Sequence, residues 1–103
     1  MAIYVAEIKG RGIAAFHADS TPIAELFVRN RAFCDDLMVA MTDSLPLWDG
    51  VTRITVRCAH PAEEAKWRGA RARAIRRGDI EADDQAWITF LVALTDPDRR
   101  KRR

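Results

Sequence analysis

Apolar residues are concentrated in two short, strand-like runs at the start of the chain. Residues 3–8 and 13–18 are rich in β-branched and aromatic side chains, a composition typical of strands. The linker between them includes Gly10 and Gly12, and glycine adopts the positive φ angles of a tight turn at little steric cost. The pattern therefore predicts a β-hairpin.

The hydrophobic period then becomes helical. Residues 19–22 (Asp-Ser-Thr-Pro) form a helix-start signature, because a side-chain oxygen caps free N–H groups and proline fits the first turn. We expect one helix over residues 22–42, with Glu25 paired to Arg29 on its exposed side. Its core face follows three- and four-residue steps through Ile23, Leu26, Phe33, Leu37 and Met41.

A loop and a third strand are predicted next. Residues 44–50 contain proline and an Asp-Gly pair, which are typical of loops. In residues 51–58 the apolar positions alternate with polar ones, so one face of this strand should be solvated. The apolar side holds Ile54, Val56 and Cys58.

A second helix is predicted from Pro61 to Gly78. Acidic residues occupy its first turn and arginines its last, which complements the helix dipole, and glycine is a common helix stop. Two stripes compete for contact with the sheet, a small-residue stripe (Ala62, Ala65, Gly69, Ala72) and one that contains Trp67. Residues 86–94 are apolar on both faces, which favours a strand buried in the middle of the sheet.

These elements predict an α+β fold in the order β-β-α-β-α-β. We expect a four-stranded mixed or antiparallel sheet with both helices on one face. This topology resembles a β-grasp arrangement or a ferredoxin-like variant, a likeness that implies no function. With 103 residues, residues 1–95 should form a single domain, and residues 96–103 should be a disordered, basic C-terminal tail.

Charge and composition narrow the class of protein. Five of the 17 Lys and Arg residues occupy the last five positions, so 12 remain against 15 Asp and Glu, and the body is mildly acidic. The abundance of arginine and alanine is a bacterial-like composition that needs no nucleic-acid partner. Neither a secretory leader nor a membrane-spanning segment is evident. We therefore expect a cytoplasmic protein with no membrane insertion and with reduced cysteines.

Two cysteines and two histidines are candidates for metal binding or catalysis. Only Cys58 and His60 are close in sequence, whereas structural zinc sites use paired close ligands, so we expect no metal and no cofactor. Cys58 with His60, or Cys34 with His17, would form a nucleophile and base. Donors for an oxyanion are not identifiable. A small cysteine/histidine enzyme is the third functional hypothesis.

The leading hypothesis is a small non-enzymatic binding or accessory protein. Tryptophan and arginine are enriched at the energetic centres of protein interfaces. Trp48 lies in the predicted loop, and Trp67 lies between two charged residues on the second helix, so both are expected to be partly exposed. Together with Arg71 they predict a surface for a protein partner or for self-association.

The alternative hypothesis is a nucleic-acid-associated protein. On an ideal helix Lys66, Arg73 and Arg77 project within about 40° of one another, because each residue advances 100°. Such basic groups neutralise phosphates without reading the base sequence. The full set of expected contacts adds Arg76 and the tail residues Arg99, Arg100, Lys101, Arg102 and Arg103.

Overall fold

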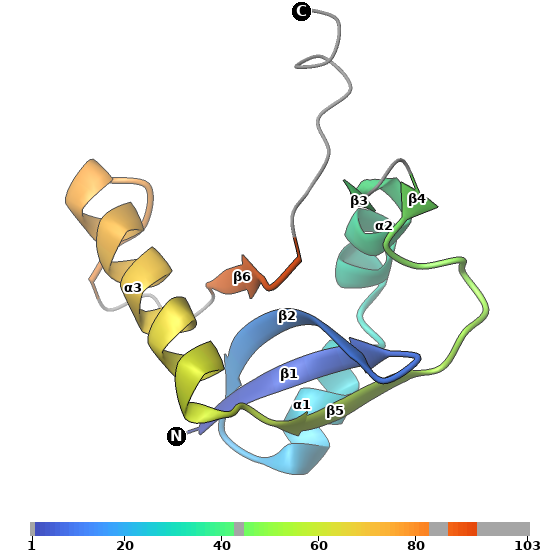
Figure 1. Cartoon of the computed structure of the whole chain (residues 1–103). Helices are drawn as coiled ribbons and strands as arrows, with labels where there is room; N and C mark the ends of the chain where they lie inside the picture. The colour runs from blue at the N-terminus through green and yellow to red at the C-terminus, as the bar shows by residue number, and fades with distance from the viewer. Residues whose placement is uncertain (1, 43–44, 83–86, 93–103) are drawn as a thin grey trace, which may run out of the picture.

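The main sheet is antiparallel, with helices packed on both of its faces (Figure 1). The computed structural model describes residues 2–42, 45–82 and 87–92. Within this part of the chain the strands have the order β5-β1-β2-β6, so the α+β class is confirmed. The sheet comprises β1 (Ala2–Ile8), β2 (Arg11–Ala18), β5 (Ile54–Cys58) and β6 (Ile88–Phe90).

Three helices and a small second sheet complete the described fold. The helices are α1 (Thr21–Phe27), α2 (Arg31–Val39) and α3 (Pro61–Arg77). The second sheet pairs β3 (Met41–Thr42) with β4 (Leu45–Pro46). The sequence predicted the end of a helix at β3 and a loop at β4, so both predictions are corrected here. The described residues contain no helix long and apolar enough to cross a membrane.

The predicted hairpin and the predicted second helix are confirmed. Strands β1 and β2 are joined by Lys9 and Gly10, whose φ angles are 55° and 78°. Two consecutive positive φ angles suit the twist of a two-residue hairpin turn. Helix α3 begins at Pro61 and stops at Gly78, whose φ of 79° is left-handed, as the glycine stop requires.

The prediction of one continuous helix over residues 22–42 is wrong, because the helical conformation is interrupted at Asn30. The backbone of Asn30 is extended, and its Oδ1 accepts hydrogen bonds from the N–H groups of Ala32 (2.9 Å) and Phe33 (3.3 Å). This cap starts α2 in a new direction. Leu26, expected in the core, is consequently 62% exposed, whereas Phe33 remains buried.

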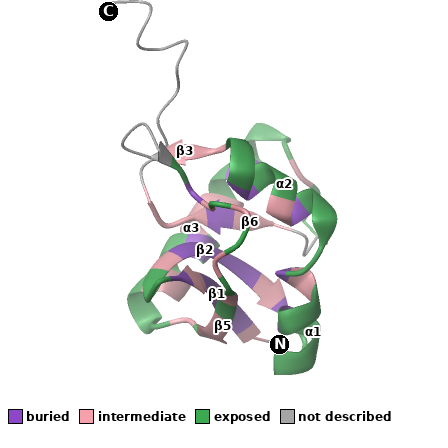
Figure 2. Cartoon of the chain, turned by 90° about the vertical axis from the view of Figure 1, so that its right-hand side faces the viewer, coloured by how far each residue is buried: buried purple, intermediate pink, exposed green. Residues whose placement is uncertain are grey.

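The expectation that both helices pack on one face of the sheet is also wrong. Val5 and Ala6 point to opposite faces of β1, and both are completely buried, so each face needs a cover. Helices α1 and α2 cover the face that carries Tyr4 and Phe16, and we call this side the first core. Helix α3 covers the other face through Trp67, and we call this side the second core. Figure 2 shows the buried residues concentrated in β1 and β2 between these helices.

Residues 86–94 do not provide the central strand that the sequence predicted. Within this stretch, β6 pairs with β2 and lies at the edge of the sheet formed by the described strands. The stretch of residues 87–91 carries apolar residues on both faces, because Ile88 and Phe90 of β6 pack on the first core, whereas Trp87 and Leu91, which flank β6, pack on the second. An edge strand covered on both faces has the same sequence pattern as a central one.

Candidate functional site

Trp67 is a core residue and not the surface residue that the sequence predicted. Its side chain is 1% exposed, and its Nε1 donates a hydrogen bond of 2.8 Å to the carbonyl of Trp87. Arg71 covers the ring, with its guanidinium carbon 5.8 Å from the ring centroid, and donates to the carbonyl of Ala82 at 2.7 Å. The small-residue stripe of α3 faces solvent instead, because burying the larger indole removes more apolar area from water.

Trp48 lies on the opposite side of the sheet from Trp67, so the structure does not bring the two together. Its indole is half-buried against the first core, and its Nε1 donates to the carbonyl of Thr52 at 2.7 Å. Its own N–H donates to the carbonyl of Leu37 at 3.2 Å. Trp48 thereby attaches the loop of residues 48–52 to the end of α2.

The cysteines and histidines do not form the pairs that nucleophilic catalysis needs. Cys34 donates its thiol to the carbonyl of Val28 at 3.3 Å, and burial raises the pKa of this thiol, with a further contribution from Asp35. Cys58 is exposed at the end of β5. Among the described residues there is no cluster of three or more potential metal ligands.

A compact ionic cluster joins β1, β5 and the first turn of α3. The Nε of Arg57 donates to Glu7 at 2.7 Å, and its two terminal nitrogens donate to the carboxylate of Glu63 at 2.7 and 2.8 Å. This bidentate bond lowers the pKa of Glu63 to about 2 and raises that of Arg57. A Cβ at Gly12 would lie 3.3 Å from the guanidinium, so glycine leaves room for it. The cluster is used inside the fold and offers little to a ligand.

An open groove lies between α1, β5 and the loop of residues 48–52. It consists of two adjacent hollows of about 240 and 360 Å³. Both hollows are lined by Val28, Arg29, Arg53 and Ile54, and we call the combined feature the α1–β5 groove. Its further lining includes Glu25, Thr55 and Val56 on one side and Trp48 and Val51 on the other.

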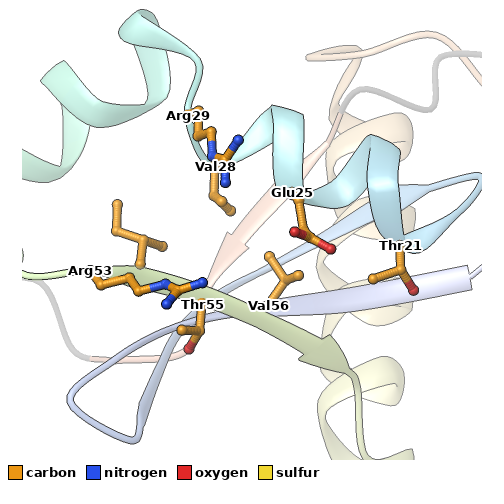
Figure 3. Close-up of a pocket in the computed structure, with 8 residues that line it drawn as sticks. Thr21, Glu25, Val28, Arg29, Arg53, Thr55 and Val56 are labelled. Atoms are coloured by element: carbon orange, nitrogen blue, oxygen red, sulfur yellow. The ribbon is translucent and has the colours of Figure 1, made fainter.

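Two arginines without partners flank this groove. Arg29 follows the end of α1, and Arg53 precedes β5 (Figure 3). In the described part of the chain no carboxylate lies within 4.0 Å of either guanidinium, although Glu25 lines the same hollow. The predicted pairing of Glu25 with Arg29 fails because α1 ends at Phe27, so the i,i+4 geometry of a helix is lost.

The outer edge of β5, beside the groove, has no partner strand in the part of the chain that the structure describes. Ala59 donates to the carbonyl of Ile3 at 2.9 Å, and hydrogen-bonded pairs alternate along an antiparallel ladder. By this alternation Thr55 and Arg57 bond to β1, whereas the N–H and C=O groups of Ile54 and Val56 point outward. No described strand pairs with this edge of β5.

The basic residues of α3 form a separate surface. Lys66, Arg73 and Arg76 are exposed and have no ion pair with any residue that the structure describes. Arg77, by contrast, pairs with Asp79 at 3.1 Å. The predicted tail contacts at residues 99–103 lie outside the described residues.

No protein family model, curated protein or solved structure matches this sequence. The function of this protein is therefore inferred from the geometry of its described residues. Sequence reasoning missed the α1–β5 groove because its walls come from segments that are distant in the sequence. The sequence offered little signal for this site, because Arg53 reads as one of the polar positions of the predicted strand over residues 51–58.

Proposed function

We propose that this protein is a small non-enzymatic binding module that holds another protein in the α1–β5 groove. The observation that carries the proposal is the combination of two arginines, Arg29 and Arg53, with an adjacent sheet edge, none of which has a partner among the described residues. Charged groups without internal partners are available to a binding partner at no cost in broken ion pairs. Arginine is also among the residues most enriched at interface centres.

Exposed apolar side chains near the groove support the same proposal. Val51, which lines the larger hollow, is 85% exposed. Met38 on α2 is half-exposed and lies near Gly50, where an added Cβ would be 3.6 Å from its terminal carbon. Large apolar side chains that gather around polar groups mark interaction sites on soluble proteins.

An enzyme built on the cysteines has less support. The nucleophilic form of cysteine is the thiolate, and burial disfavours this form at Cys34 by raising its pKa. Cys58 has no hydrogen bond to His60 in the part of the chain described. A base positioned by such a bond is the usual means of activating a thiol.

Reversing the two groove charges should abolish partner capture. The wild type is cross-linked to its partners in an extract of its source cell. We expect the double variant R29E/R53E to capture at least about ten-fold less of these partner proteins, because interface charges of the wrong sign repel the partner. The control variant R73E/R76E changes the net charge equally on α3, at the other face of the sheet, and should retain them. Quantitative mass spectrometry measures both. Equal capture by the wild type and R29E/R53E would contradict the proposal.

Nucleic-acid binding is the second candidate function, favoured by the exposed and unpaired Lys66, Arg73 and Arg76 on α3. Their positions on one side of the helix suit contacts with successive phosphates. The mildly acidic body weighs against a strong contribution.

The same variants test this second candidate in reverse. If α3 binds nucleic acid, R73E/R76E should weaken binding of single-stranded or duplex DNA of about 20 nucleotides and reduce the salt slope by about two, because two phosphate contacts are lost. R29E/R53E should then have little effect. Fluorescence anisotropy at two salt concentrations provides the measurement. Binding that is absent, or that is unchanged in R73E/R76E, would exclude this function for α3.

A further inference from the structure

We infer that the partner enters the α1–β5 groove as an extended acidic segment that adds a fifth strand to the sheet along β5. This inference rests on the proposed function and specifies the class of partner. It is carried by two independent features of the same site, namely the open backbone of β5 and the charge of the groove.

The backbone of β5 has the hydrogen-bonding groups that strand addition needs. Peptides that join a sheet bond to the unpaired N–H and C=O groups of its edge strand. The outward groups of Ile54 and Val56 are two residues apart, which is the spacing at which an added strand makes its bonds. The side chains of both residues are only partly buried, whereas β1 and β2 are largely buried.

The charge of the groove selects an acidic segment. Two arginines and one carboxylate, Glu25, line the smaller hollow, and the same two arginines line the larger one, whose lining contains no carboxylate among the described residues. Asp or Glu residues of a partner would receive charge-assisted hydrogen bonds from Arg29 and Arg53, which are about twice as strong as neutral ones. A basic segment would be repelled, and a second copy of this chain would bring two further arginines to the same edge.

Charges on natural edge strands often serve to prevent pairing, but Arg57 cannot act in this way. Its guanidinium points to Glu7 and Glu63 and makes four hydrogen bonds within the protein. Within the part of the chain that the structure describes, Arg53, which directly precedes β5, is the charged residue of this segment that is left to discourage pairing. An acidic partner would instead form an ion pair with Arg53 and use it as a binding group.

A random peptide library provides the direct test. Phage-displayed peptides of about ten residues are selected on the full chain and then depleted on R29E/R53E. We expect the selected peptides to be enriched in Asp, Glu and β-branched residues and poor in proline. A synthetic copy should bind the wild type and R73E/R76E equally, and should bind R29E/R53E at least about ten-fold more weakly, because its carboxylates lose their partners.

Two further measurements distinguish strand addition from charge attraction alone. N-methylation of alternate residues along one edge of the peptide keeps its charge but removes its donors, and should weaken binding at least about ten-fold. Amide hydrogen exchange at Ile54 and Val56 should slow when the peptide binds. Both results together support the inference.

The outcomes separate this inference from the proposed function. Peptides that need Arg29 and Arg53, but tolerate N-methylation or leave Ile54 and Val56 exchanging freely, would overturn strand addition and leave the groove as a binding site. Selection of basic or neutral peptides would overturn the acidic partner. A library with no peptide that depends on the groove would overturn both, as would protection of these amides by dimerisation of the free chain.

Discussion

Replacement of Trp67 by alanine is expected to lower the free energy of unfolding by about 3–5 kcal/mol. The indole is 1% exposed and lies at the centre of the second core, against Ile3, Val5 and Ala15. Its removal leaves a cavity and also takes away the donor to the carbonyl of Trp87. Domains of this size are stable by only about 5–15 kcal/mol, so the variant should be close to unfolding.

Urea denaturation, monitored by circular dichroism, measures the change in the free energy of unfolding. Trp67→Phe is the matched control, because phenylalanine keeps most of the ring volume. Its free energy of unfolding should fall clearly less than that of Trp67→Ala. In a domain of this size, a decrease of 1 kcal/mol in the free energy of unfolding lowers the melting temperature by about 4–8 °C. We therefore expect the melting temperature of Trp67→Ala to fall by more than about 12 °C. A loss below about 1.5 kcal/mol would contradict the assignment of Trp67 to the core.

The elements that the sequence predicted well are those with local signals at both ends. The hairpin has glycine at its turn, and α3 has proline at its start and Gly78 at its end. The break before α2 also has a local signal, because Asn30 is a good cap. The hydrophobic pattern does not show this break, because apolar residues continue at three- and four-residue steps on both sides of Asn30. A repeating hydrophobic period does not show that the backbone between the repeats is helical.

The linear pattern contains part of the layer order, and the rest depends on contacts between distant segments. Apolar residues on both sides of β1 require a cover on each face, and consecutive residues such as Val5 and Ala6 already carry that information. Which strand lies at the centre is decided by pairing between distant segments. Residues 88–90 and β1 have similar apolar patterns, but only β1 has a strand on each side.

The candidate site shows the same limit. The charged neighbours of Trp67 in sequence suggested exposure, but they lie about 100° away on either side of the helix and say nothing of the direction of the indole. The predicted pairing of Arg29 with Glu25 requires a helix that continues through residue 29, whereas α1 ends at Phe27. The α1–β5 groove follows from the early end of α1 and from the edge position of β5, and both are tertiary features.

Replacement of Glu63 by glutamine is expected to lower the free energy of unfolding by about 2–3 kcal/mol at neutral pH. The bidentate hydrogen bond from Arg57, together with the bond from the N–H of His60, lowers the pKa of Glu63 from 4.5 to about 2. Each pKa unit corresponds to 1.36 kcal/mol. The side chains of Glu63 and Arg57 are 20% and 27% exposed, so solvent screens this interaction less than it screens an ion pair on the open surface.

The effect should depend on pH in a defined direction. The native state favours the ionised form of Glu63, so the stabilisation is complete above about pH 4.5 and is lost as the pH falls towards 2. The difference between the wild type and Glu63→Gln should therefore be largest at neutral pH and shrink towards zero near pH 2. The exposed Asp49, whose pKa is also about 2 through its bonds to Thr52 and Val51, is present in both proteins and cancels in the difference.

Urea denaturation at several pH values between 2 and 7 measures this difference. Glu64→Gln is the control, because Glu64 forms an exposed pair with Arg68 at 2.8 Å, and such pairs contribute less than about 1 kcal/mol. A Glu63→Gln effect that equals the control effect, or that does not change with pH, would show that the ionic cluster does not hold α3 to the sheet. A difference that falls with the protonation of Glu63 identifies this carboxylate as the main link between the first turn of α3 and β5, the strand whose outer edge borders the groove.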